Sequence, residues 1–258
     1  MRSDLFNLVI LAAGNLESEF NAAGYKSPKN LLIVDNKPLL CSTLFALGTK
    51  ASRIYLVTRR VEEIQFQTSL KVRNELSIEL AQKIETIQIG STSGSLVSSL
   101  LGIDSYPAEG PLIFQSGDIL IGTGISEFIS KSIRQNLDSS ILTVQSFEDR
   151  WSFISSGRDG ELLGIYPKTA ISDQVAAGVY YYKDRDTFLR SATHALINSS
   201  LTESSLHFSK SCMSASILGM NVKCIQFPKS ELRFLASPGD YLKYLSSNEN
   251  PENSESSF

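Results

Sequence analysis

The first apolar segment of the chain, with the small residues that end it, constrains the fold more than any other feature. Residues 5–11 form a nearly continuous apolar run, and Ala12-Ala13-Gly14 follows directly. Such a run is typical of a parallel strand buried on both faces. A strand ending in small residues and a glycine lets backbone amides approach a phosphate without a side chain in the way. A tight strand–helix turn without a ligand would have the same sequence.

Strand-like and helix-like segments then alternate along the chain. Strands are expected at 31–34, 53–58, 84–89, 112–115, 140–145, 175–182 and 222–227, and helices at 39–48, 61–73, 94–101, 125–133, 186–196 and 206–217. This alternation predicts an α/β fold with a Rossmann-like, doubly wound sheet that is mixed but mainly parallel. A hairpin is expected at 151–166, because Asp159-Gly160 is a turn signal.

The domain organisation and composition are those of a globular protein. Residues 1–245 are expected to form one domain, and residues 246–258, which are almost without apolar side chains, are expected to be disordered. The net charge of -3 gives no general attraction for nucleic acid or an anionic membrane, so an anionic ligand has to be held by local cations and amides. No apolar run reaches the roughly 18–20 residues of a membrane span.

The cysteines point to a reducing compartment. Cys41, Cys212 and Cys224 are odd in number and lack a CxxC spacing. Thiols packed as small hydrophobic side chains are the expected state, and a cytoplasmic location follows from it.

Five segments occur in an order that is more specific than any one of them. LVILAAG with PKNLLIVDNKPLL comes first (8–14 and 28–40), followed by STSGSL (91–96), PLIFQSGDIL (111–120), GELLGIYPK with AAGVYYY (160–182) and SPGDYLKY (237–244). This order resembles the sugar-phosphate nucleotidyltransferase family. The GYKSPK form of residues 24–29 is similar to a branch found in capsule and surface-polysaccharide gene clusters. The resemblance implies the fold of nucleotide-diphospho-sugar transferases, the GT-A type.

The resemblance also implies an activity. A nucleoside monophosphate would pass from an NTP to a sugar-1-phosphate, or a similar phosphorylated metabolite, with release of pyrophosphate. The product would serve surface polysaccharide biosynthesis. The family often self-associates, so a homo-oligomer is a further expectation, whereas nucleic acid and membrane partners are not expected.

Particular residues acquire roles from the same resemblance. Lys29 and Asp118 would be catalytic, and Asp118 would hold Mg²⁺, which prefers carboxylate and phosphate oxygens. Lys168 and Gly178 would contact the sugar phosphate. The nucleotide would be bound by Leu11, Ala12, Ala13, Gly14, Thr92, Ser93, Gly94 and Gly117. Taken alone, the residues also allow a solvated loop lysine at position 29, a turn-capping aspartate at 118, an exposed lysine at 168 and a bulge glycine at 178.

Three departures from the family pattern bear on turnover. The loop after Gly14 lacks the family's second glycine and arginine, and carries Glu17 and Glu19, which would repel a triphosphate unless they face outward. A second metal-binding aspartate is missing near Phe234, and a serine, residue 91, replaces a family glycine. Lys26 is a candidate substitute for the arginine, although an ammonium group does not reproduce a bidentate guanidinium contact.

These observations leave three classes of function open. An active nucleotidyltransferase is favoured by Lys29 and Asp118. A catalytically degenerate binding or regulatory subunit is favoured by the altered loop. A glycosyltransferase that consumes a nucleotide-sugar is disfavoured, because Asp118 is followed by Ile119-Leu120 and not by the Asp-x-Asp pattern common in such enzymes.

Overall fold

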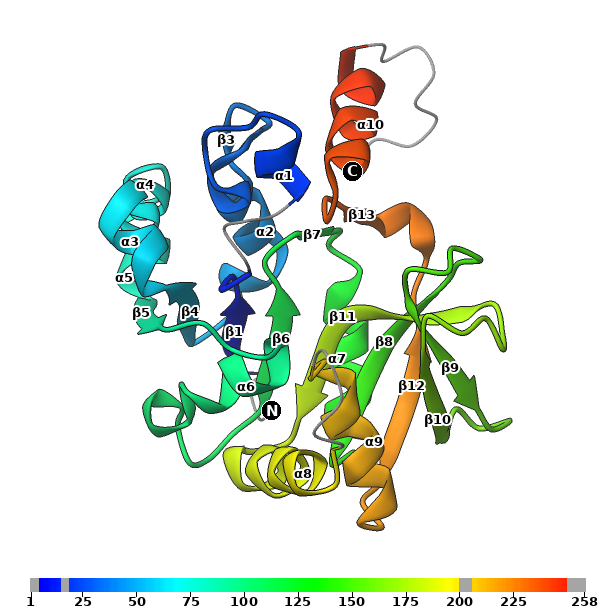
Figure 1. Ribbon diagram of the computed structural model, residues 1–258. Helices are drawn as coiled ribbons and strands as arrows, with labels where there is room; N and C mark the ends of the chain where they lie inside the picture. The colour runs from blue at the N-terminus through cyan, green and yellow to red at the C-terminus, as the bar shows by residue number, and fades with distance from the viewer. Residues whose placement is uncertain (1–4, 15–18, 200–205, 250–258) are drawn as a thin grey trace.

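Figure 1 shows the computed structural model, which describes residues 5–14, 19–199 and 206–249. The strands are β1 (Asn7–Leu11), β2 (Ile33–Val34), β3 (Lys37–Pro38), β4 (Arg53–Arg59), β5 (Ile84–Ile89), β6 (Leu112–Ser116), β7 (Ile119–Ile121), β8 (Ser139–Gln145), β9 (Ser152–Ser156), β10 (Leu162–Pro167), β11 (Gln174–Tyr182), β12 (Val222–Gln226) and β13 (Leu232–Phe234). The α-helices are α1 (Glu19–Ala22), α2 (Leu39–Gly48), α3 (Arg60–Phe66), α4 (Thr68–Asn74), α5 (Ile78–Gln82), α6 (Ser95–Leu100), α7 (Ile125–Arg134), α8 (Arg185–Ile197), α9 (Ser209–Ile217) and α10 (Pro238–Glu249). Short 3₁₀ helices are η1 (Lys29–Leu31), η2 (Ile103–Ser105) and η3 (Lys229–Glu231).

The main sheet is mixed and mainly parallel, as predicted. Its strand order is β10-β9-β11-β6-β1-β4-β5, with β8 pairing β11 and β12 pairing β8. β1 is parallel to both β4 and β6, β4 is parallel to β5, and β8 is parallel to β12. β11 runs antiparallel to β6 and β8, and the predicted hairpin forms the antiparallel pair β9–β10. The β1 and β6 strands therefore end at the same edge of the sheet.

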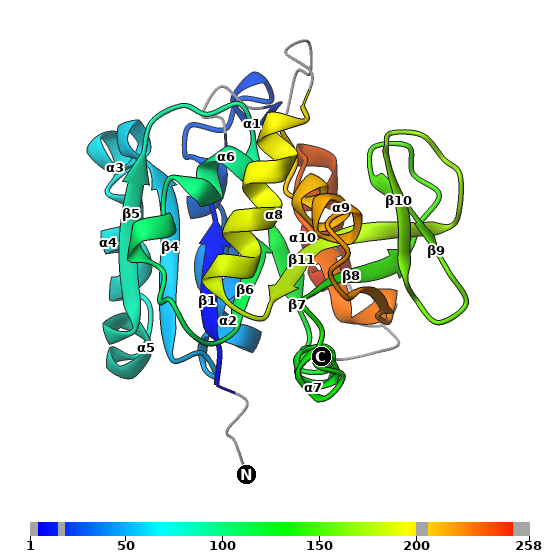
Figure 2. The ribbon, with the colours of Figure 1, turned by 90° about the horizontal axis from the view of Figure 1, so that it is seen from below.

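Helices cover both faces of this sheet, which makes it doubly wound. One core layer joins Leu8 and Ile10 of β1 to α2 and α7. The other joins Val9 of β1 to aromatic side chains of β6, β11 and α8. Figure 2 shows α8 and α9 together on one face, away from α7. The apolar run of β1 is buried from both sides, which explains its unbroken hydrophobic pattern.

Consecutive tyrosines in β11 illustrate the same division. Tyr180 and Tyr182 point into one core layer and Tyr181 into the other, because neighbouring side chains of a strand face opposite ways. All three rings are buried. These three side chains therefore pack in the core on the two faces of the sheet.

Three segments differ from the predicted elements. Residues 61–73 form two helices, because Gln67 adopts a left-handed backbone conformation with a φ of 53° between α3 and α4. The segment 31–34 begins in the 3₁₀ helix η1, and only Ile33 and Val34 pair, with β3. Helix α9 begins at Ser209, because Leu206 and Phe208 instead bond to Ser93 and to the first residues of α6.

The C-terminal helix α10 packs on the segment that leads to Lys29. The Tyr241 hydroxyl donates to the Ile33 carbonyl at 2.8 Å, and the Tyr241 ring meets Phe20 and Tyr25 edge-on. The helix continues through Glu249, beyond the expected domain boundary at 245, and residues 250–258 lie outside the described residues.

A bidentate ion pair holds the start of α10 to the loop after β8. Arg150 donates to the two carboxylate oxygens of Asp240 at 2.7 and 2.9 Å, and its guanidinium lies over Trp151 at 4.5 Å from the ring centroid. Asp240 also accepts from the backbone N–H and hydroxyl of Ser237. Partial burial raises the pKa of Asp240, but these donors outweigh it and the pKa is lowered.

This ion pair predicts a pH-dependent stability. Because the pKa of Asp240 is lower in the folded chain than in the unfolded one, its contribution is complete at neutral pH and is lost as pH falls through the folded value. The Asp240→Asn variant is expected to melt below wild type at pH 7, with the gap closing below about pH 4. Thermal unfolding across this range is the measurement, with the exposed Asp104→Asn as control. A gap that stays constant as pH falls contradicts the assignment.

Two further predictions concern cysteines and membrane spans. Cys41, Cys212 and Cys224 are buried free thiols, as expected from their spacing. Among the described helices, none combines the length and the apolar character that crossing a membrane requires.

Candidate active site

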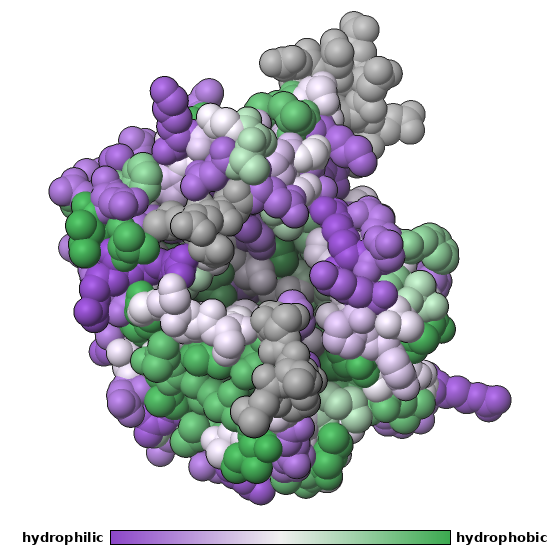
Figure 3. Space-filling model, viewed as in Figure 1, coloured by the Kyte–Doolittle hydropathy of each residue, from purple (hydrophilic) through white to green (hydrophobic). Residues whose placement is uncertain are grey.

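A cavity of about 640 Å³ opens where β1 and β6 end. Figure 3 shows a hollow in the middle of this face. The carboxyl edge of a parallel sheet is where α/β folds bind ligands. The cavity is lined by Leu11, Ala12, Ala13, Gly14, Glu19, Phe20, Pro28, Lys29, Asn30, Glu62, Thr92, Ser93, Gly94, Ser95, Ser98, Ser116, Gly117, Asp118 and Ala236. All the predicted nucleotide-binding residues and both predicted catalytic residues are in this set, and their roles remain predictions.

The loop that follows β1 is anchored to the strands on both sides of it. The Ala12 N–H donates to the Val57 carbonyl at 2.9 Å, and the Leu11 carbonyl accepts from the Gly117 N–H at 3.0 Å. A Cβ on Gly117 would lie 3.1 Å from the Ala12 Cβ. Small residues in both loops thus let the ends of β1 and β6 come together beneath the cavity.

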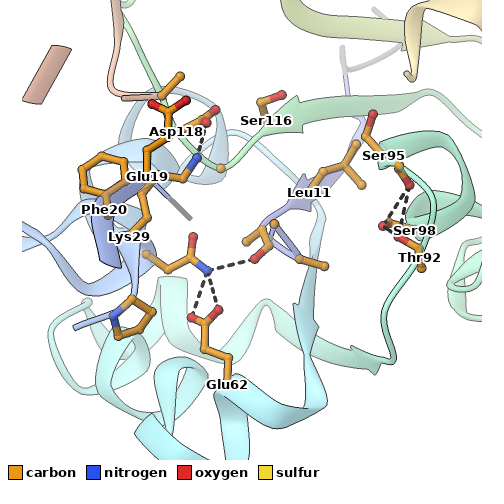
Figure 4. Close-up of a pocket in the computed structure, with 18 of the residues that line it drawn as sticks. Leu11, Glu19, Phe20, Lys29, Glu62, Thr92, Ser95, Ser98, Ser116 and Asp118 are labelled. Carbon is orange, nitrogen blue, oxygen red and sulfur yellow. Dashed lines mark hydrogen bonds and ion pairs between the residues drawn. The ribbon is translucent and has the colours of Figure 1, made fainter. Parts of the chain in front are cut away.

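Lys29 and Asp118 form an ion pair across the cavity. The Lys29 Nζ lies 2.5 Å from the Asp118 Oδ2, and both side chains are mostly buried, at 25% and 19% exposure. Lys29 comes from η1, and Asp118 from the turn between β6 and β7. The Asp118 carboxylate contacts Lys29 and does not cap the turn that follows it. Figure 4 shows the pair with Glu19 beside it.

Buried polar side chains brace the turn that carries Asp118. The Thr43 hydroxyl donates to the Gly117 carbonyl at 3.0 Å, and the Gln115 amide donates to the Ile119 carbonyl at 3.0 Å. The Asp118 carbonyl accepts from the Leu235 N–H at 2.8 Å. Both ends of this turn are therefore fixed, which sets the position of the carboxylate.

The opposite wall of the cavity is rich in hydroxyl groups. The Thr92 and Ser98 hydroxyls are 2.7 Å apart, and the Ser95 hydroxyl accepts from the Phe208 N–H. Gly94 has a φ of 150°, and a Cβ there would lie 2.4 Å from the Leu206 carbonyl oxygen. The close approach of the Leu206 backbone therefore requires a glycine at position 94, whether or not a nucleotide binds there.

The two predicted sugar-phosphate residues lie outside the cavity lining. Lys168 is exposed after β10, where its N–H donates to the Trp151 carbonyl. Gly178 lies in β11 where the register with β8 shifts, with a φ of 77°. A Cβ on it would come within 2.5 Å of the Ile119 side chain. Gly178 therefore has the geometry of a bulge glycine, the second of its two interpretations.

The charge around the cavity is mostly negative. Glu19, Glu62 and Asp118 line it, and Lys29 is the one cation among the described lining residues. Lys26 is exposed and does not line the cavity, so the described geometry does not support it as a substitute for the missing arginine. Glu17 lies outside the described residues. A polyanionic ligand here would depend on Lys29, backbone amides and a bound metal ion.

The donor set suits a metal that arrives with phosphate groups. Among the described residues, no group of three or more His, Cys, Asp or Glu side chains could enclose a metal ion. Mg²⁺ usually needs only one or two protein carboxylates, because substrate phosphates and water fill its other positions. Asp118 meets this requirement as a single carboxylate at the cavity wall.

Sequence patterns did not single out two buried polar residues of the site. Asn30 and Glu62 are only 5% and 2% exposed, and the Asn30 Nδ2 lies 2.9 Å from the Glu62 Oε1. Glu62 is in a helix with a charged sequence and has the pattern of a solvated residue. The one local signal was the position of Asn30, directly after Lys29.

Comparisons with known proteins identify other structures with the same fold. No family model and no curated protein matches the sequence. Among solved structures, the chain is similar to a nucleoside-diphosphate-sugar pyrophosphorylase from Vibrio cholerae, at 19% identity and a TM-score of 0.76, over 93% of this chain and 99% of the other. It is also similar to the inositol-1-phosphate CTP transferase from T. maritima, at 16% identity and 0.72, over 99% and 100%. A candidate glucose-1-phosphate thymidylyltransferase from Bacillus anthracis, in complex with sucrose, matches at 12% identity and 0.71, over 98% and 97%. The chain thus has the fold of these nucleotidyltransferase structures along nearly its whole length.

Two glycines of the site allow ligand contact to be separated from stability. A Cβ on Gly14 meets no described atom within 4 Å, whereas a Cβ on Gly94 collides with Leu206. The Gly14→Ala variant is expected to keep its melting temperature and, if a phosphate group contacts this loop, to weaken NTP binding about tenfold, because one charged hydrogen bond is displaced. Gly94→Ala is expected to lower the free energy of unfolding by about 1–3 kcal/mol. Thermal unfolding and NTP titration test both, and a Gly14→Ala variant with unaltered NTP binding would show that no phosphate approaches this loop.

Proposed function

We propose that the protein is a nucleotidyltransferase. It transfers a nucleoside monophosphate from an NTP to a sugar-1-phosphate, or a similar phosphorylated metabolite, and releases pyrophosphate. The observation that carries the proposal is the Lys29–Asp118 pair, which faces the Ala12–Gly14 loop across one cavity. The similarity of the fold to a nucleotide-sugar pyrophosphorylase and an inositol-1-phosphate CTP transferase supports it.

The proposed reaction is a substitution at the α-phosphorus of the NTP. A phosphate oxygen of the acceptor forms a bond to that phosphorus, and the bond from the α-phosphorus to the α–β bridging oxygen breaks. The electron pair of the broken bond leaves with pyrophosphate. No proton needs to be removed from an ionised phosphate, so the protein has to align two anions and stabilise the charge that develops.

Different residues of the cavity bind the triphosphate, stabilise its charge and hold the metal. The backbone around Ala12, Ala13 and Gly14 holds the triphosphate, and Lys29 stabilises negative charge on the phosphate oxygens. Lys29 exchanges the Asp118 carboxylate for a phosphate group when substrate binds. Asp118 would hold Mg²⁺, which neutralises charge on the phosphates when it is bound. Thr92, Ser93 and Gly94 form the wall for the nucleoside.

A second candidate function rests on the charge of the cavity. With Lys29 as the one described cation and three acidic residues in the lining, a degenerate binding or regulatory subunit would retain the fold and bind nucleotide without turnover. A glycosyltransferase is a weaker alternative, because one carboxylate, Asp118, projects from the turn after β6.

A substrate panel distinguishes these functions. The four common NTPs are each combined with several sugar-1-phosphates and Mg²⁺, and pyrophosphate release is measured together with the shift in melting temperature on adding NTP. An enzyme releases pyrophosphate only when both substrates are present. A thermal shift without release indicates a binding subunit, and release of a nucleoside diphosphate from a nucleotide-sugar indicates a glycosyltransferase. A panel with neither release nor shift contradicts the proposal.

The biological role is proposed from residues 24–29 alone. Their GYKSPK form is similar to the branch associated with capsule and surface polysaccharide, so the product would be an activated precursor for such a polymer. A homo-oligomer is proposed because proteins of the family that the sequence resembles often self-associate. Light scattering of the purified protein tests it, and a monomer at working concentration contradicts it.

A further inference from the structure

A buried hydrogen-bonded triad lies under the cavity and joins three separate segments. The Asn30 Nδ2 donates to the Ala12 carbonyl at 2.8 Å and to the two oxygens of Glu62 at 2.9 and 3.1 Å. Ala12 belongs to the loop after β1, Asn30 to η1, and Glu62 to the first turn of α3. Figure 4 shows Glu62 and the dashed contacts that join these segments.

Glu62 is an unusual residue to bury in this place. It is 2% exposed, and the donors on its oxygens, the Asn30 amide and the Thr68 hydroxyl at 2.8 Å, are neutral. Burial raises the pKa of Glu62, and the hydrogen bonds from Asn30 and Thr68 lower it in part. A buried carboxylate is costly and one held by neutral donors is rarely retained for stability alone.

The chemistry of the two side chains fixes the orientation of the Asn30 amide. An ionised carboxylate only accepts hydrogen bonds, and so does the Ala12 carbonyl. Both acceptors therefore require the NH₂ group of Asn30 and exclude its oxygen. With a donor at position 62, the amide could turn over and place its oxygen against the Ala12 carbonyl, where the two would repel.

The orientation of Asn30 matters because of its neighbours. Lys29 precedes it in the same single turn of 3₁₀ helix, and Ala12 lies in the loop proposed to hold the triphosphate. We propose that Glu62 is a positioning residue that, through Asn30, holds the backbone of the Lys29 turn against the Ala12–Gly14 loop. This inference rests on the proposed function, because it assigns the site two phosphate-binding elements that must keep a fixed separation.

Exchanging the hydrogen-bond donor and acceptor between positions 30 and 62 distinguishes a positioning role from a contribution to stability alone. Asn30→Asp places two carboxylates and a carbonyl together, so it is expected to lower both the melting temperature and kcat. Adding Glu62→Gln restores a donor–acceptor pair between positions 30 and 62, but still leaves a carboxylate oxygen against the Ala12 carbonyl. The double variant is expected to recover most of the melting temperature lost in Asn30→Asp, while kcat stays about 10- to 100-fold below wild type. Recovery of kcat together with melting temperature would overturn the proposal.

A neighbouring glutamate supplies the matched control. Glu63 is 8% exposed and accepts from the Ser69 N–H and hydroxyl at the corner between α3 and α4, outside the cavity lining. Glu63→Gln removes a buried negative charge one residue away without touching Asn30. It is expected to keep kcat and KM at wild-type values even where it lowers the melting temperature. A loss of kcat equal to that of the double variant would show that any buried charge change in α3 has this effect.

Amide exchange tests the same contact without relying on activity. The Ala12 N–H is bonded to the Val57 carbonyl, so its hydrogen exchange reports how firmly the loop is held. Exchange at Ala12 is expected to be faster in Asn30→Asp and in the double variant, and unaltered in Glu63→Gln. Unaltered exchange in the double variant would overturn the positioning role. A wild-type protein without pyrophosphate release would instead count against the proposed function, and the exchange result would still decide whether Glu62 holds the loop.

Discussion

Replacing Lys29 with methionine is expected to lower kcat for pyrophosphate release by about 100- to 1000-fold. Lys29 is the one described cation in the cavity lining, and its ammonium contacts Asp118 at the cavity wall. Methionine keeps most of the length of the side chain and removes the charge. Removing a single positive group aimed at developing phosphate charge has an effect of this size. Steady-state kinetics with saturating NTP and acceptor measure it.

The control for this variant is a lysine on the same part of the chain. Lys37 is exposed in β3 and does not line the cavity, so Lys37→Met removes the same charge from the protein as a whole. It is expected to retain wild-type kcat. Equal losses in the two variants would mean that Lys29 acts through the general field of the protein. Full activity in Lys29→Met would remove Lys29 from the proposed catalytic residues and leave it with the Asp118 ion pair alone.

Replacing Asp118 with asparagine is expected to change nucleotide binding and turnover in opposite directions. Lys29 is held by Asp118 in the free site at 2.5 Å, so a metal-free NTP has to displace a carboxylate before it gains the ammonium. Without that carboxylate, metal-free NTP is expected to bind up to about fivefold more tightly, equivalent to ~1 kcal/mol for a partly exposed ion pair. Turnover with Mg²⁺ is expected to fall at least about 100-fold, because the metal loses its carboxylate.

Calorimetric titration with and without Mg²⁺ measures the binding part of this prediction, and pyrophosphate release measures the rest. Asp149→Asn is a suitable control, because Asp149 is exposed in the loop after β8 and outside the cavity lining. Weaker metal-free binding in Asp118→Asn would mean that Asp118 contacts the nucleotide directly. Unaltered Mg²⁺ dependence would remove Asp118 from the proposed metal site.

The elements with strong local patterns were predictable from the sequence. The unbroken apolar run of β1 has that pattern because helices cover both faces of the sheet, and the hairpin β9–β10 has a turn that requires a positive φ, at Gly160. Gln67 carried no comparable signal. Its left-handed backbone divides one predicted helix into two, although glutamine is not a residue that favours this conformation.

The site was only partly predictable, because its contacts join distant positions. The sequence order identified Lys29 and Asp118 through a resemblance, whereas their direct contact across 89 positions is a result of the fold. Glu62 has the sequence pattern of a surface charge, yet it is buried and accepts a hydrogen bond from Asn30, 32 positions away. Gly94 was predicted to bind the nucleotide, and the structure shows a further reason for a glycine there, because the Leu206 backbone occupies the position of its missing side chain.

The proposed function requires that one cavity binds the triphosphate between the Ala12–Gly14 loop and Lys29. A crystal structure of the protein with NTP and Mg²⁺ tests it most directly. We expect phosphate oxygens at the Lys29 ammonium, the metal at Asp118, and the Lys29–Asp118 contact of the free protein broken. A triphosphate bound elsewhere, or one bound in this cavity while Lys29 and Asp118 remain paired, would contradict it.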